Sequence, residues 1–166
     1  MNPIPIRIVC GGQTGADRGA MMAALDRGVP LAGWCPSGRK AEDGKIPSFY
    51  PVRELPGSDY PERTLRNVLD SDATCIVRFS DVDAGSKLAA AACRREDKPY
   101  LYLDAHELDS DDAADVLETF IRDNAVAVLN ISGPRASVHP AAESWTRAAL
   151  RTCLAALQSG RALPRQ

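Results

Sequence analysis

Short apolar runs alternate with segments of helical periodicity along most of this chain. Residues 4–9 form an apolar run rich in β-branched side chains, which predicts a strand buried on both faces. Residues 16–27 carry an apolar stripe at helical spacing and end at Gly28, which suits the left-handed C-cap of a helix. Residues 29–34 form a second apolar run. Because the connections are short, this strand–helix–strand unit predicts a right-handed crossover between parallel strands.

The same alternation returns after residue 60. Further strands are expected at residues 74–79, 99–103 and 126–131, and further helices at residues 60–70, 87–96, 111–124 and 141–158. Strict alternation predicts an α/β fold: a single Rossmann-like, doubly wound domain over residues 1–166, with a five-stranded, mostly parallel sheet and helices on both faces. The expected strand order, counted along the chain, is 2-1-3-4-5. Ligands of such sheets bind at the carboxyl ends of the strands.

One long segment, residues 35–62, breaks the alternation. It contains five prolines and three glycines and shows no regular periodicity. A segment of this length in a compact domain is either functional or disordered. Its aromatic residues, among them Phe49 and Tyr50, argue against disorder. We therefore expect an ordered loop that folds over the binding cleft.

Composition and charge exclude several classes of protein. The net charge is −2, so no overall basic surface is present to attract nucleic acid or a membrane. No apolar run approaches the roughly 20 residues that cross a bilayer, and the N-terminus lacks the pattern of a signal peptide. The five cysteines are scattered without a CxxC pair, which predicts reduced thiols and no metal site. We expect a cytoplasmic protein.

A glycine-rich stretch follows the first predicted strand and opens the first predicted helix. Glycines allow tight turns, and a helix N-terminus offers unpaired N–H groups and a positive dipole end, so this arrangement is typical of an anion site. The candidate ligand-binding residues here are Gly11, Gly12, Gln13, Thr14, Gly15, Asp17 and Arg18. A tight turn without a ligand, with Asp17 as a helix cap, remains the alternative.

Three later loops offer further donors and cations for the same site. Because the strands are parallel, the loops that follow them meet at one edge of the sheet. Arginine can grip an oxyanion with two N–H groups, and a helix N-terminus adds more donors. Solvated charges and plain helix capping are the alternatives. The candidates in these loops are Arg39, Lys40, Gly85, Ser86, Gly133 and Arg135.

No spacing in the sequence identifies a nucleophile with its base. The patterns GxSxG, HExxH and Walker A are absent, and neither His106 nor His139 lies near a candidate nucleophile. We therefore assign no catalytic residue. The convergent groups are donors and cations, which favours binding of an anionic ligand over catalysis.

These motifs together resemble the molybdenum cofactor carrier protein family, part of a Rossmann-like group that includes DNA-processing protein A and the Lonely Guy phosphoribohydrolases. The resemblance covers about residues 6–157 and rests on residues 11–18, 33–44, 46–47, 50–51, 62–64, 67–68, 70–74 and 133–137. It implies a carrier that binds molybdenum cofactor (molybdopterin), forms a dimer or tetramer of identical chains, and serves a molybdoenzyme recipient. Molybdate or a nucleotide is the alternative ligand.

One departure from the related phosphoribohydrolases bears on catalysis. In those enzymes a glycine-rich turn is followed by glutamates that perform the chemistry, whereas residues 83–89 here contain no glutamate. A nucleotide-processing enzyme with Asp17 or Asp72 as acid or base remains a second hypothesis. A nucleotide-ligand sensor that acts through a protein partner is a third.

Overall fold

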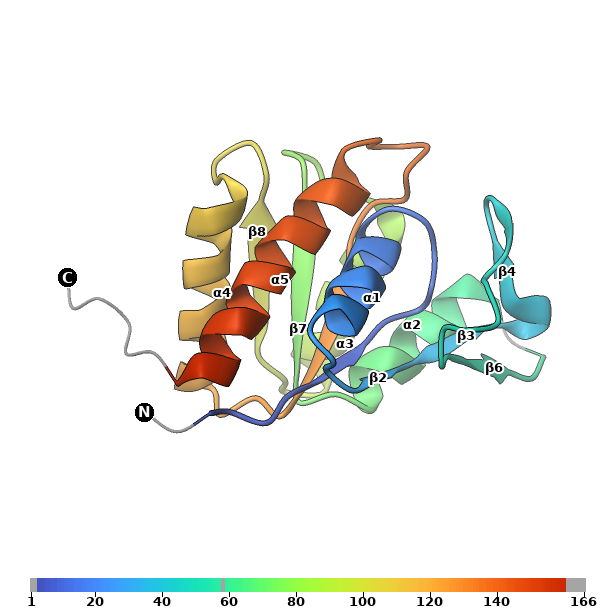
Figure 1. The fold of residues 1–166 in the computed structure, drawn as a ribbon. Helices are drawn as coiled ribbons and strands as arrows, with labels where there is room; N and C mark the ends of the chain where they lie inside the picture. Colours follow the sequence, from blue (N-terminus) through green and yellow to red (C-terminus); the bar gives the residue numbers. More distant parts are fainter. Residues whose placement is uncertain (1–2, 58, 161–166) are drawn as a thin grey trace.

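The computed structural model describes residues 3–57 and 59–160 (Figure 1). Five parallel strands form the main sheet: β1 (Arg7–Val9), β2 (Leu31–Ala32), β7 (Ala73–Arg78), β8 (Tyr100–Asp104) and β9 (Val128–Ser132). The helices are α1 (Ala16–Asp26), α2 (Tyr60–Leu69), α3 (Ala84–Arg95), α4 (Ser110–Asp123) and α5 (Ala142–Ser159). The predicted α/β class, the doubly wound parallel sheet and the number of its strands are confirmed.

The strand order differs from the expected 2-1-3-4-5. The sheet runs β2-β1-β9-β7-β8, so the fifth sheet strand in the chain lies between the first and the third. Hydrophobic periodicity identifies each strand but not its neighbours, and both orders fit the same alternation of strands and helices. When β9 is counted as the first strand, the order becomes 3-2-1-4-5, the order of a doubly wound Rossmann sheet.

Helices cover both faces of the sheet. Helices α1, α4 and α5 pack together on one face, and α2 and α3 pack together on the other (Figure 1). The larger core lies under the first group and includes Ile8, Leu129 and Leu154, each with no exposed area. The smaller core, under α2 and α3, is built mainly from alanines of α3 and from Val68 and Ile76. Small side chains allow α3 to lie close to the sheet.

The segment predicted as one long loop contains short strands. β3 (Trp34–Pro36) pairs with β6 (Arg53–Leu55), and β4 (Lys40–Ala41) pairs with β5 (Gly44–Lys45), with a 3₁₀ turn, Ser37–Arg39, between β3 and β4. We call residues 35–57 the connecting segment. It packs beside the loop that follows β1 and leads into α2, whose N-cap is Asp59.

Gly15 allows the N-terminus of α1 to touch the loop after β9. Its backbone has φ 78° and ψ −128°, and a Cβ at this position would lie 2.2 Å from the carbonyl oxygen of Pro134. That carbonyl accepts the N–H of Ala16 at 3.1 Å. The conformation and the close approach both require glycine here.

We predict that Gly15→Ala lowers the free energy of unfolding by about 3 kcal/mol, because the methyl group clashes with backbone and strains φ. Gly28→Ala is the matched control: Gly28 has φ 63°, and nothing lies within 4 Å of an added Cβ. It should cost only about 1 kcal/mol. Urea unfolding followed by circular dichroism measures both, and equal losses would contradict this account of Gly15.

Candidate functional site

A cavity of about 450 Å³ lies among the loops that follow β1, β7 and β9, beside the start of α2. These loops gather at the upper edge of the sheet in Figure 1. Polar and apolar groups share the lining, which consists of Gln13, Asp17, Tyr60, Pro61, Arg63, Asp83, Ala84, Gly85, Leu88, Ser132, Gly133, Arg135, Ser137 and Val138. The site therefore joins three loops, with the loop after β9 between the loops that follow β1 and β7.

Several N–H groups at the glycine-rich loop bind acceptors of the protein itself. The N–H of Gln13 donates to Oδ2 of Asp17 at 3.1 Å, and the N–H of Thr14 donates to Oε1 of Gln13 at 3.0 Å. The N–H of Ala16 binds the carbonyl of Pro134. The carboxylate of Asp17 thus occupies the place that a ligand anion would take in this loop.

Asp17 is buried and forms an ion pair with Arg63 across the glycine-rich loop. Its Oδ2 lies 3.2 Å from Nη1 of Arg63, and only 4% of the residue is exposed. Burial raises the pKa of Asp17 above its ordinary value, and Arg63 with the N–H groups of Gln13 and Gly11 offsets this only in part. Gly11 leaves room for the pair, because a Cβ there would lie 1.4 Å from Nη1 of Arg63.

Two buried donors of the cavity lining have no partner in the described part of the chain. Oε1 of Gln13 accepts the N–H groups of Thr14 and Glu42, the latter at 2.9 Å, so this geometry fixes the orientation of the amide. Its Nε2 is buried and unpaired, as is Nε of Arg63. A buried donor without a partner costs about 1–3 kcal/mol. An acceptor group that reached these two atoms would remove this cost.

Helix α3 and Arg135 add a helix N-terminus and a cation to the cavity lining, which also contains the carboxylate of Asp83. Asp83 caps α3 by accepting the N–H of Ser86 at 3.0 Å, so Ser86 lies inside the first turn and Gly85 lines the cavity. The N-terminus of α3 therefore faces this space with its dipole. Arg135 is exposed, and its guanidinium makes no hydrogen bond or ion pair with the residues that the structure describes.

Of the predicted site residues, the cavity is lined by Gln13, Asp17, Gly85, Gly133 and Arg135. Several others support the loops instead. Arg18 donates from Nε to the carbonyl of Gly12 at 2.8 Å and grips Asp43 with both terminal nitrogens. Thr14 donates to Glu42, whose carboxylate also accepts the hydroxyl of Ser137 at 2.5 Å. These contacts tie the connecting segment to the loops after β1 and β9.

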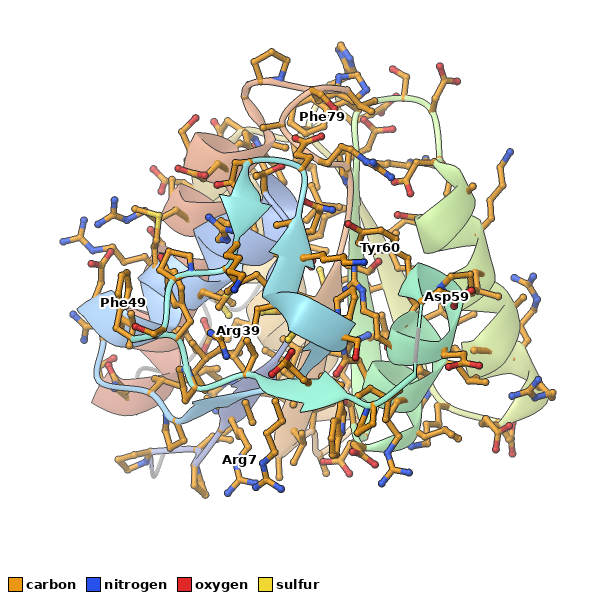
Figure 2. All side chains as sticks on the ribbon, turned by 90° about the vertical axis from the view of Figure 1, so that its right-hand side faces the viewer. Arg7, Arg39, Phe49, Asp59, Tyr60 and Phe79 are labelled. Carbon is orange, nitrogen blue, oxygen red and sulfur yellow. The ribbon has the colours of Figure 1, made fainter. Side chains whose placement is uncertain are left out.

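Arg39 and Lys40 lie away from the cavity. The guanidinium of Arg39 donates to four backbone carbonyls of the connecting segment at 2.8–3.1 Å, those of Ile46, Pro47, Tyr50 and Val52. Figure 2 shows Arg39 within this segment and apart from Tyr60. Lys40 is exposed in β4. Arg39 therefore stabilises the connecting segment, because its donors are used there.

The apolar walls of the cavity were not identified from the sequence. They come from Tyr60, Pro61, Leu88 and Val138. The charged residue Arg63, which also lines the cavity, was not identified from the sequence either. The available signal was the motif at residues 62–64, which the resemblance included without assigning it a place. Trp34 lines a separate hollow of about 150 Å³ with Arg7 and Arg53, among other residues.

The second carboxylate considered for catalysis, Asp72, serves the fold. Its Oδ2 accepts the N–H groups of Ala127 and Val128 at 3.0 and 2.8 Å, at the start of β9. That end of the strand is opposite to the cavity. Asp17 is therefore the one of the two that lines the cavity.

No cluster of three or more histidine, cysteine, aspartate or glutamate side chains is arranged to hold a metal ion within residues 3–57 and 59–160. Within the same ranges, no helix is long and apolar enough to span a membrane.

The fold and the cavity define a doubly wound α/β protein with a cavity at the carboxyl ends of its strands. The model of the circularly permutated YpsA SLOG family matches residues 8–154, so the chain belongs to this family. The description agrees with the strand order, which becomes that of a Rossmann sheet when β9 is counted first.

A solved structure supports the same relationship. The crystal structure titled "Putative molybdenum carrier protein" from Syntrophus aciditrophicus SB superposes on this chain with a TM-score of 0.89, and the two sequences are 39% identical. The match covers 93% of this chain and 98% of that one. The resemblance inferred from the motifs is confirmed. No curated protein matches the chain.

We predict that Arg39→Lys lowers the free energy of unfolding by about 2 kcal/mol or more, because one ammonium cannot replace a guanidinium that binds four carbonyls. Faster hydrogen exchange at residues 46–52 should accompany the loss. Lys40→Met is the control, since it changes the neighbouring exposed cation and should stay within about 0.5 kcal/mol of the unaltered protein. Unchanged exchange in Arg39→Lys would contradict the structural role.

Proposed function

We propose that this protein binds and carries molybdenum cofactor, or a related ligand that joins a planar heterocycle to a phosphate or another oxyanion. The observation that carries the proposal is the pair of buried, unpaired donors, Nε2 of Gln13 and Nε of Arg63, in side chains that line one cavity. Both need an acceptor, and an oxyanion supplies several.

The shape and chemistry of the cavity support a ligand with two different parts. A volume of about 450 Å³ lies within the usual range of small-molecule sites. Tyr60, Leu88 and Val138 provide apolar surface for a flat ring, while Arg63 and Arg135 provide charge for an anionic group. Molybdenum cofactor combines a pterin, a phosphate and an oxo-metal head, and the neighbouring structure is named a molybdenum carrier.

Carriage requires that the ligand be delivered as well as bound. By the family resemblance, the recipient would be a molybdoenzyme and the carrier a homo-oligomer. The mouth of the cavity suits transfer, because Arg135 and Val138 lie at the surface, with Val138 52% exposed. A ligand seated there remains within reach of a second protein.

A nucleotide-processing enzyme is the second candidate function. The observation that favours it is Asp17, a buried carboxyl of raised pKa in the cavity lining, because such groups act as general acids. Release of a free base from nucleoside monophosphates, lost in Asp17→Asn, would support the enzyme. Saturable binding without turnover supports the carrier.

We predict that Gln13→Glu weakens binding of molybdate or of molybdenum cofactor at least tenfold. A glutamate keeps an oxygen for the N–H groups of Thr14 and Glu42, but it replaces the unpaired donor with a second acceptor that repels an anion. Isothermal titration calorimetry measures the affinity. The free energy of unfolding, measured in parallel, shows whether the fold is retained.

Removal of the exposed cation should weaken binding as well. Arg135→Ala is expected to reduce the affinity several-fold, and Arg151→Ala is its matched control because Arg151 is an exposed arginine of α5 outside the cavity. If neither anion binds the unaltered protein saturably, or if Gln13→Glu and Arg151→Ala behave alike, the proposed function is contradicted.

A further inference from the structure

The charge balance around Asp17 determines what a bound anion must do to it. Asp17 belongs to the first turn of α1, and its carboxylate faces Arg63 of α2 at 3.2 Å. Arg18, the next residue of α1, directs its guanidinium to Gly12 and Asp43. Arg63 is therefore the cation that holds this buried carboxylate among the described residues.

The other charged and titratable groups near Asp17 are neutral, bound to other partners or exposed to solvent. The Cys10 thiol lies behind the loop, and its sulfur donates to the backbone carbonyl of Asp17; burial raises the pKa of Cys10 well above its ordinary value, so it stays neutral. On the β7–α3 loop, both oxygens of Asp83 bind Ser86. On the β9–α5 loop, Arg135 is exposed to solvent.

Arg63 is shared between Asp17 and the cavity. One terminal nitrogen, Nη1, binds Asp17, while Nε is buried and unpaired. The side chain runs over Gly11, where no Cβ obstructs it. An oxyanion that meets Nε of Arg63 and Nε2 of Gln13 would come close to the buried carboxylate of Asp17, where water screens repulsion poorly.

We propose that Asp17 takes up a proton when an oxyanion binds beside Arg63, so that anion binding to this cavity is coupled to protonation. This inference rests on the proposed function, since it concerns the same cavity. Protonation of Asp17 removes its negative charge, which would repel the anion, and allows Arg63 to pair with the ligand. It also becomes a donor that can serve the anion.

The direction of the pH effect follows from linkage. A bound anion disfavours the charged carboxylate, so the pKa of Asp17 rises further in the complex. Burial has already raised it in the free protein, which lowers the cost of protonation. Between the free and the bound pKa, binding consumes a proton, so affinity is higher at low pH and falls as the pH rises. The protein would hold its anion more tightly in acid and release it as the pH increases.

Sulfate is the probe for the test because it remains a dianion from pH 5 to 8.5 and adds no titration of its own. Calorimetric titration at one pH, in two buffers of different ionisation enthalpy, counts the protons taken up on binding. The dissociation constant is then followed over the same pH range. We expect uptake of up to about one proton, with a dissociation constant that increases by up to about tenfold per pH unit.

Asp17→Asn should bind sulfate without proton uptake and with little pH dependence. Asp115→Asn, which changes an exposed carboxylate of α4, should behave like the unaltered protein. Proton uptake is measured first in the unaltered protein, and this part of the test does not depend on the folding of any variant. Sulfate binding without uptake, or uptake that persists in Asp17→Asn, would overturn the inference and leave the proposed function intact. Failure of the unaltered protein to bind sulfate, molybdate and molybdenum cofactor would overturn both.

Discussion

The buried ion pair between Asp17 and Arg63 fixes how the parts of this site meet. It joins α1 to α2 across the glycine-rich loop, and that loop can be crossed only because Gly11 has no side chain. Loss of one partner from such a pair costs about 3–5 kcal/mol. Asp17 also accepts the N–H of Gln13, so this donor of the loop serves the protein itself. In the proposed function, side chains recognise the ligand: the amide of Gln13 and the guanidinium groups of Arg63 and Arg135.

The position of β9 in the sheet makes the cavity a three-loop site. β9 lies between β1 and β7, so its following loop lies between theirs. The carbonyl of Pro134 caps α1, and Ser137 binds Glu42 of the connecting segment. Glu42 in turn supplies the N–H that orients Gln13. The connecting segment therefore lies outside the cavity lining, but through Glu42 it orients the amide of Gln13, which belongs to the lining.

The sequence predicted the fold class well because alternating apolar periodicity reports burial directly. It could not predict the strand order, since periodicity does not identify a strand's neighbours. Glycines correctly marked the loops after β1 and β9, but a glycine does not reveal which acceptor takes each N–H. Arg39 illustrates the limit: its carbonyl partners at residues 46–52 reach it only after the connecting segment folds back. Tyr60 and Arg63 were missed because α2 approaches the cavity only in the folded chain.

A crystal structure with molybdate tests the central claim most directly, because molybdenum scatters anomalously and its position is unambiguous. We expect an anomalous peak in the cavity, with an oxyanion oxygen within hydrogen-bond distance of Nε2 of Gln13 and of Arg63, and with the N–H of Gln13 still on Asp17. A peak held instead by the backbone N–H groups of residues 11–15, with Asp17 displaced, would contradict it. So would a saturated crystal whose peaks all lie outside the cavity.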